Sequence, residues 1–222
     1  AHGQGRLKAG DDQPRVFKIA QDGQLACHRQ PQQRFFPAGI CRDAPGGGIV
    51  EPYGFVFALM ENALLNGVQL KTGFRLIAAR RETELWELEA ADGRSIRARW
   101  LVNAAGLFAD EVSRLAGAED FTIHARKGEY YLLDKRAGHL ARHPLFPVPT
   151  AFSKGIVVTP TVDGNLLVGP NSQVVEGTSD LDTTAAGLDE VITGARRLVP
   201  SIPLRDNITN FAGLRATAQP SG

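Results

Sequence analysis

The sequence is short of cysteine, of net charge and of long apolar runs. Its 222 residues include two cysteines, Cys27 and Cys41, which are too few for a disulfide framework and are not spaced as metal ligands. A net charge of +1 argues against a nucleic-acid binder that works through a broad basic surface. No run approaches the roughly 18 apolar residues that cross a bilayer, and no signal-peptide pattern opens the chain. These absences predict a reduced, cytoplasmic protein.

A glycine-rich phosphate loop is also missing. Gly46-Gly47-Gly48 is followed neither by GxGxxG spacing nor by a Gly-Lys-Ser/Thr triplet. The hydrophobic content of 43% and the charged content of 22% are ordinary for a globular protein, and the length suits one large domain or two modest ones. Because Ala1 stands where an initiator Met would, we expect a processed, trimmed or partial chain.

The most informative stretch runs from Arg99 to Gly117. Trp100-Leu101-Val102 has strand character, Asn103 to Gly106 supplies small side chains, and Asp110-Glu111 opens an amphipathic helix. Such a junction is where α/β sheets bind ligands beyond the strand ends. Small side chains would let a flat cofactor or its phosphates approach the backbone. A tight connection that binds no ligand explains the pattern equally well.

Apolar periodicity predicts two further helices. One begins near Pro52 and ends at Asn66-Gly67, and the other spans 183–199 and ends at Pro200. The expected buried faces are Val56, Leu59, Met60, Ala63 and Leu64 in the first helix, and Leu188, Val191, Ile192, Ala195 and Leu198 in the second. Strands are expected at 15–19, 68–72, 74–79, 86–90, 95–100, 128–134, 146–150, 155–161, 165–170 and 208–215, with 155–161 and 165–170 forming a hairpin.

Six phrases occur in order between Gly48 and Ala216: GIVEPYGFVFALMENALLNGV, LVNAAGLFADEVSRLAG, ARKGEYYLLDK, LFPVPT, KGIVVTPTVDGNLLVGPNS and FAGLRA. Together they resemble the FAD-dependent oxidoreductases of the D-amino-acid oxidase superfamily. They are most similar to its L-2-hydroxyglutarate oxidase and glycerol-3-phosphate dehydrogenase-like branch. The resemblance implies an α+β fold, with an incomplete α/β FAD-binding layer and a mixed or antiparallel β-sheet substrate domain that includes a helix.

Domain limits and function follow from the same resemblance. It implies a partial FAD-binding domain at 49–117 and 208–222, a substrate-binding sheet domain at 118–207, and a poorly matched segment at 1–48. The implied activity is oxidation of a 2-hydroxy acid, such as L-2-hydroxyglutarate, or of glycerol 3-phosphate by hydride transfer to FAD. The implied partner is a small anionic substrate. A membrane-associated electron acceptor, a place at the inner membrane face and a homo-oligomer are left open.

Site residues are assigned only at positions where this sequence matches a motif of the family. Ala104, Ala105 and Gly106 resemble the turn beside the adenosine end of FAD, and Leu76 falls at the strand position that contacts adenine. Gly213 and Leu214, within FAGLRA, are assigned to the cofactor as well. Arg215 resembles a position that clamps a substrate anion, a task that suits a planar guanidinium; an interdomain arginine paired with an aspartate is the alternative.

Aromatic and histidine side chains complete the candidates. One tyrosine of the Tyr130-Tyr131 pair would face the flavin and the other the core; we assign Tyr131 to the substrate, although core packing explains either tyrosine. A histidine would suit acceptance of the substrate hydroxyl proton. His124, His139 and His143 occur in no spacing that identifies such a base, and no metal-ligand spacing appears.

The departures from the family pattern matter as much as the matches. The family's GxGxxG turn has no counterpart here, and the sequence stops shortly after FAGLRA. We therefore expect this polypeptide alone to hold FAD weakly or not at all, and a stoichiometric flavin absorbance band would refute that. Exposed apolar surface is expected on 49–117. A truncated, non-catalytic paralogue that acts as a binding or assembly module is the alternative function.

Overall fold

The computed structural model describes residues 15–19, 25–29, 41–42, 49–148 and 155–220, and the statements below concern these residues. Helices are combined with antiparallel sheets, which confirms the predicted α+β class. Every strand pairing in the described part of the chain is antiparallel. The glycine triplet at 46–48 lies outside the described residues.

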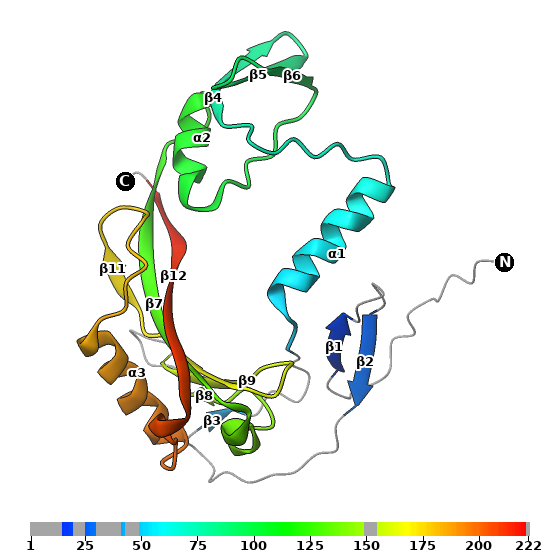
Figure 1. Ribbon diagram of the computed structural model, residues 1–222. Helices are drawn as coiled ribbons and strands as arrows, with labels where there is room; N and C mark the ends of the chain where they lie inside the picture. Colours follow the sequence, from blue (N-terminus) through cyan, green and yellow to red (C-terminus); the bar gives the residue numbers. More distant parts are fainter. Residues whose placement is uncertain (1–14, 20–24, 30–40, 43–48, 149–154, 221–222) are drawn as a thin grey trace, which may run out of the picture.

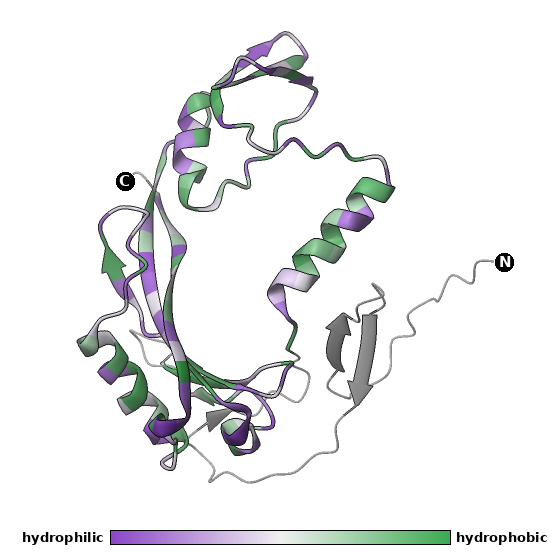
Figure 2. Cartoon of the chain, viewed as in Figure 1, coloured by the Kyte–Doolittle hydropathy of each residue, from purple (hydrophilic) through white to green (hydrophobic). Residues whose placement is uncertain are grey.

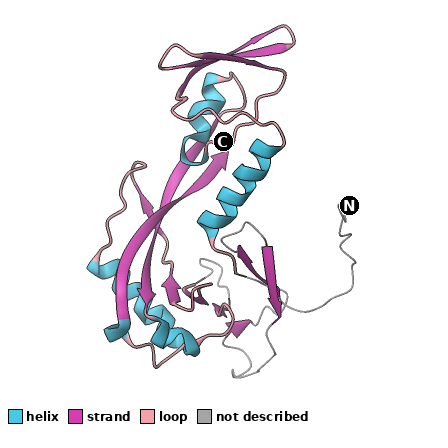
Figure 3. Ribbon diagram, turned by 45° about the vertical axis from the view of Figure 1, so that its right-hand side comes forward, coloured by secondary structure: helices cyan, strands magenta, loops and turns pink. Residues whose placement is uncertain are grey.

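Two long paired strands are the longest of a five-stranded sheet (Figures 1 and 3). β7 (Phe121–Leu133) pairs with β12 (Asn207–Pro220) along its whole length, from Phe121 opposite Pro220 to Leu133 opposite Asn207. The other edge of β7 pairs with β10 (Leu166–Gly169) and then with β11 (Gln173–Val175). β9 (Val157–Pro160) pairs with β10, so the predicted hairpin is confirmed.

The helix α3 (Ala185–Leu198) covers one face of this sheet (Figure 1). Four of the five residues of its predicted apolar face, Val191, Ile192, Ala195 and Leu198, are buried, and the fifth, Leu188, is half-buried. The four buried residues pack against Leu133, Val158, Leu166 and Val168 of the sheet, which forms the main hydrophobic core. Burial of this stripe, rather than helix propensity alone, fixes the helix on the sheet.

A second, three-stranded sheet is a meander of β4 (Leu76–Glu82), β5 (Leu85–Ala90) and β6 (Ser95–Ala98). The turn η1 (Gly106–Phe108) and the helix α2 (Ala109–Leu115) join it to the strand pair, because α2 contacts both β4 and β7. The remaining described elements are β1 (Arg15–Ile19), β2 (Leu25–Arg29), β3 (Cys41–Arg42), β8 (Phe146–Pro147), η2 (Lys135–Leu140) and η3 (Leu204–Asp206).

Two predicted strands are wrong. Residues 68–72 and 100–102 form neither strands nor helices, although both have strand-like composition. Trp100 and Val102 are 84% and 83% exposed, so neither a neighbouring strand nor a core covers them. A β-strand exists only where a partner supplies its hydrogen bonds, and the described chain brings none to these segments.

β12, predicted to belong to the partial FAD-binding domain, pairs with a strand of the predicted substrate-binding domain. Residues 208–220 are hydrogen-bonded to β7, which belongs to the predicted substrate sheet, over the full length of the strand. The last strand therefore shares a sheet with residues 121–133, and the division of the chain into two domains remains a prediction.

The helix α1 (Pro52–Leu65) is predicted correctly in its bounds but wrongly in its burial. The Glu51 carboxylate accepts hydrogen bonds from the backbone N–H groups of Tyr53 and Gly54, and this caps the helix. No residue of α1 is buried, and Tyr53 and Leu65 are 76% and 88% exposed. Figure 2 shows the helix as largely apolar, so the predicted exposed apolar surface on 49–117 is confirmed. In the described part of the chain, no helix has the length and hydropathy needed to span a bilayer.

Candidate functional site

The face of the β7–β12 pair that turns away from α3 gathers the candidate functional side chains. Residues directly opposite one another on antiparallel strands point to the same side of the sheet. The register places Tyr130 opposite Phe211, Arg126 opposite Arg215 and His124 opposite Thr217. We call the surface made by these six residues, with Gly128 and Gly213 between them, the site face. Their neighbours Lys127, Glu129 and Leu133 point to the other side and are buried.

An aromatic pair forms one end of the site face. The rings of Tyr130 and Phe211 are stacked, with centroids 5.0 Å apart and an interplanar angle of 11°. Burial raises the pKa of Tyr130 above its ordinary value, and the charge of the nearby Arg215 guanidinium opposes that rise. The phenol therefore stays protonated at neutral pH and remains a hydrogen-bond donor.

The two glycines of the site face differ in what surrounds them. A Cβ on Gly128 would lie 2.6 Å from Cβ of Pro170, so the chain's own packing requires glycine there. A Cβ on Gly213 would meet no atom within 4 Å, and the backbone of Gly213 is not left-handed. Neither sterics nor conformation within the described chain accounts for glycine at 213. Open space at this position fits a flat group that approaches the strand closely.

Two positively charged arginines lie beside that space. Arg126 and Arg215 lie opposite each other on adjacent strands, and Arg126 Nη1 donates a hydrogen bond of 3.1 Å to Ser172 Oγ. No carboxylate of the described residues forms an ion pair with either guanidinium. Next to them, Thr217 Oγ1 is buried and finds no hydrogen-bond partner among the described residues. The face thus offers cationic groups to a ligand, next to a buried hydroxyl oxygen that lacks a hydrogen-bond partner among the described residues.

The small-residue turn at 104–106 is held in place by its own side chains. Asn103 Nδ2 donates to the Ala109 carbonyl at 2.7 Å, and Asn103 Oδ1 accepts from the Ala105 N–H at 3.3 Å. Gly106 has a φ of +58°, a left-handed conformation that favours glycine. The following turn, η1, contacts both β7 and β12, whereas Leu76 begins β4, which contacts α2. Hence 104–106 is joined to the strand pair directly, and Leu76 through α2.

Asp110 attaches this turn to β7. Its carboxylate accepts N–H hydrogen bonds from Glu111 at 2.9 Å and Ile123 at 3.3 Å, and it lies 3.5 Å from Arg114. Burial by itself would raise the pKa of Asp110, but these hydrogen bonds and the Arg114 charge outweigh it and hold the pKa below its usual 3.8. The attachment therefore depends on the ionised carboxylate.

We expect Asp110→Asn to lower the free energy of unfolding at neutral pH by about 1–2 kcal/mol, because two N–H groups lose a charged acceptor. A group whose pKa is lowered on folding stabilises above its unfolded pKa, and that stabilisation is lost as the pH falls through the folded pKa. Denaturant unfolding at several pH values should show the difference from wild type shrinking below about pH 4. Glu111→Gln, an exposed change on the same helix, is the control and should have little effect at any pH. A pH-independent difference for Asp110→Asn would contradict the assignment.

Two of the predicted site residues lie on the opposite side of the sheet. Tyr131 packs against the core beneath α3, and Leu214 lies opposite Lys127 on the same side. Tyr130, rather than Tyr131, therefore shares a face with Arg215. The site-face positions of Arg126 and Thr217 escaped sequence reasoning, although alternation from Tyr130 down to His124 contained the signal for β7.

Behind the site face, β7 is locked to the N-terminus of α3. The buried Glu129 carboxylate accepts hydrogen bonds from Thr184 N and Thr184 Oγ1, each at 3.0 Å. The buried Lys127 ammonium donates to Asp180 at 2.8 Å and to the Asp182 carbonyl at 3.0 Å. These bonds fix the strand from which Arg126, Gly128 and Tyr130 project.

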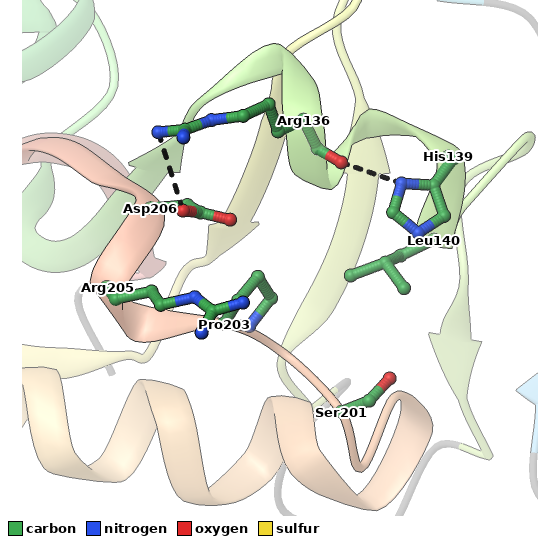
Figure 4. A pocket seen from close by; sticks show the side chains of 7 residues that line it. All are labelled: Arg136, His139, Leu140, Ser201, Pro203, Arg205 and Asp206. Carbon is green, nitrogen blue, oxygen red and sulfur yellow. Dashed lines mark hydrogen bonds and ion pairs between the residues drawn. The ribbon is translucent and has the colours of Figure 1, made fainter.

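A pocket of about 650 Å³ lies elsewhere, where η2 follows β7 and η3 precedes β12 (Figure 4). Arg136 contacts Asp206 at 3.6 Å across it, and His139 Nδ1–H donates to the Arg136 carbonyl at 2.7 Å. None of the residues assigned to the site lines this pocket; His139, a histidine without an assigned role, does. About seven strand residues, or about 23 Å, separate Arg126 from its rim. Its lining is Arg136, His139, Leu140, Ser201, Pro203, Arg205 and Asp206. Within the described ranges no cluster of three or more His, Cys, Asp or Glu side chains could hold a metal ion.

Known proteins share sequence and fold with this chain. The model of the family "FAD dependent oxidoreductase" matches residues 9–222. A glycerol 3-phosphate dehydrogenase from Caloramator mitchellensis is 38% identical over 176 residues, which cover 79% of this chain and 36% of that protein. The mitochondrial L-2-hydroxyglutarate dehydrogenase of Mus musculus is 35% identical over 106 residues, which cover 45% of this chain and 23% of that protein.

Among solved structures, the FAD-bound, dithionite-reduced L-α-glycerophosphate oxidase of Mycoplasma pneumoniae superimposes with a TM-score of 0.67 at 26% identity. The match covers 74% of this chain and 44% of that one. The chain spans about a third of the length of the curated relatives that it matches over most of its own length, including the glycerol 3-phosphate dehydrogenase at 36% and a Mycoplasma genitalium glycerol 3-phosphate oxidase at 30%.

Proposed function

This chain belongs to the family of FAD-dependent oxidoreductases, and from that premise we propose that it supplies the substrate-binding part of an enzyme that oxidises a small anionic alcohol. The observation on which the proposal depends is the open space at Gly213, between the Tyr130–Phe211 stack and Arg215. We place glycerol 3-phosphate first among the substrates, because a relative that matches 79% of this chain is a glycerol 3-phosphate dehydrogenase. A 2-hydroxy acid such as L-2-hydroxyglutarate comes second.

The residues present fit the flavin. The space over Gly213 would admit a flat ring close to β12, and the small side chains of Ala104, Ala105 and Gly106 would lie beside its adenosine end. When bound, FAD supplies the hydride acceptor for the alcohol. The family membership and the FAD-bound solved neighbour support this cofactor.

The other steps belong to this chain's own residues. Arg215 would bind the substrate anion through its planar, two-pronged guanidinium, which matches a carboxylate or phosphate. The stacked Tyr130 and Phe211 would keep water from one side of the bound alcohol. With the anion and the rings fixed, the carbinol carbon would be held facing the flat ring that occupies the space over Gly213, where orientation lowers the barrier to transfer.

Flavin occupancy and reduction test the proposal. The 222-residue chain is mixed with excess FAD, and the bound flavin is then titrated without oxygen with glycerol 3-phosphate or with glycerol. We expect binding that needs FAD in excess over protein, because the sequence has no GxGxxG turn, and bleaching of the bound flavin by glycerol 3-phosphate but not by glycerol. Equal bleaching by both, or none by either, would overturn the assignment of an anionic substrate.

A non-catalytic binding or assembly module is the second candidate, favoured by the uncovered apolar residues of α1. A chain that takes up no FAD in excess and binds no glycerol 3-phosphate, but self-associates through α1, would support it. For the oxidoreductase, the proposal includes a membrane-associated electron acceptor met at an inner membrane face. A homo-oligomer is compatible with either candidate.

A further inference from the structure

Two arginines face the same side of the sheet at a place where a pair of like charges is unfavourable. Arg126 and Arg215 are direct cross-strand partners, so their Cβ atoms lie about 5 Å apart by the geometry of antiparallel pairs. Both guanidinium groups are charged at every physiological pH. Like charges placed opposite each other destabilise a strand pair. No ion pair to a described carboxylate offsets their repulsion.

Arg126 is also oriented by a contact that does not neutralise it. Its Nη1 donates to Ser172 Oγ at 3.1 Å, and Ser172 lies between β10 and β11, which flank the same stretch of β7. A hydroxyl fixes the guanidinium plane while leaving its charge and its remaining N–H donors available. The buried, unpartnered Thr217 hydroxyl lies two positions from Arg215 on the same face.

We propose that Arg126 is a second cation of the substrate site, so that Arg126 and Arg215 together receive a doubly charged headgroup, that of a phosphate monoester. This inference rests on the proposed function, since it assigns the substrate anion to the site face. A dianion between the two arginines relieves their mutual repulsion and takes two sets of charge-assisted hydrogen bonds. A monocarboxylate, with one charge and two oxygens, is satisfied by Arg215 alone. Arg126 thereby sets the preference for phosphate over carboxylate.

Chemical protection tests this residue by residue on the full chain. Phenylglyoxal modifies accessible arginines, and mass spectrometry of peptides gives the rate at each one. At ten times its Kd, glycerol 3-phosphate should slow modification of Arg126 and Arg215 about tenfold, since occupancy follows 1 + [L]/Kd. Lactate, a monocarboxylate, should protect Arg215 only. Arg142, an exposed arginine between η2 and β8, is the internal control and should react at an unchanged rate.

Variants give an independent measurement. Arg126→Gln should raise the Kd for glycerol 3-phosphate about tenfold or more and leave the Kd for lactate within about twofold. Arg142→Gln is the matched control and should change neither, and thermal unfolding checks that each variant is folded. Protection and weakening at Arg215 alone would overturn the role of Arg126 and leave the proposed function standing. No protection at either arginine would overturn the anion site itself, and with it both proposals.

Discussion

Gly187→Ala is expected to destabilise the wild-type chain and to stabilise a chain that carries Glu129→Ala. A methyl group on Gly187 would overlap both carboxylate oxygens of Glu129, which is fully buried. Overpacking of this kind lowers the free energy of unfolding by about 1–3 kcal/mol. Without the carboxylate the overlap disappears, and alanine in place of glycine within a helix gains up to about 1 kcal/mol.

Glu129→Ala by itself should lower the free energy of unfolding by about 3 kcal/mol. It removes two hydrogen bonds between the carboxylate and Thr184, the residue that caps α3, and it leaves a cavity under the helix. A carboxylate at this helix N-terminus also interacts favourably with the helix dipole. These hydrogen bonds hold α3 against the sheet behind the site face, so their loss should destabilise the fold strongly for a single substitution.

A double-mutant cycle measures this coupling. It needs the free energy of unfolding in denaturant for the wild type, the two single variants and the double variant. The coupling energy should be about 2–3 kcal/mol, with a sign change for Gly187→Ala between the two backgrounds. Thr193→Ala, an exposed change on the same helix, is the control and should stay within about 0.5 kcal/mol in either background. Additive effects of Glu129→Ala and Gly187→Ala would show that the carboxylate does not occupy the space beside Gly187.

This buried network also shows where sequence reasoning ends. The run of β-forming residues at 128–134 predicted a strand that β7 confirms as far as Leu133, but it gave no reason to bury a glutamate in the middle of it. The burial of Glu129 depends on Thr184, which is 55 residues away in the sequence, and such a partner has no local signature. Which of Tyr130 and Tyr131 shares a face with Arg215 could not be read from the sequence for a related reason. Alternation separates the two faces of a strand, but only the helix packed on one face says which side is the core.

The helix α1 shows the converse limitation. Its first-turn proline and its terminal Asn66-Gly67 are local features, and they predicted the bounds of the helix correctly. Burial depends on what surrounds a helix, and apolar residues all around α1 give no single face to bury. The exposed Trp100 and Val102 show the same for a strand. Their composition favours an extended chain, but a sheet forms only where a partner strand is present.

Gly213→Val should separate folding from ligand binding more sharply than any other change on the site face. No atom lies within 4 Å of the position of a Cβ at 213, and valine suits a strand interior better than glycine. We therefore expect an unchanged or higher free energy of unfolding. The valine methyl groups would fill the space beside Arg215, so the affinity for glycerol 3-phosphate should fall about 100-fold, or about 2.7 kcal/mol.

Gly128→Val is the matched control, because it makes the same change on the neighbouring strand of the same face. There the new side chain meets Pro170, whose Cβ would be 2.6 Å from the added Cβ, so the variant should lose stability by at least about 2 kcal/mol. Thermal unfolding and calorimetric titration of both variants give the comparison. A Gly213→Val chain that folds normally and keeps its affinity would mean that the space over Gly213 holds no ligand. If that chain unfolds instead, the space is closed in solution. Only a stable variant that no longer binds is consistent with a glycine kept at 213 for the sake of a ligand.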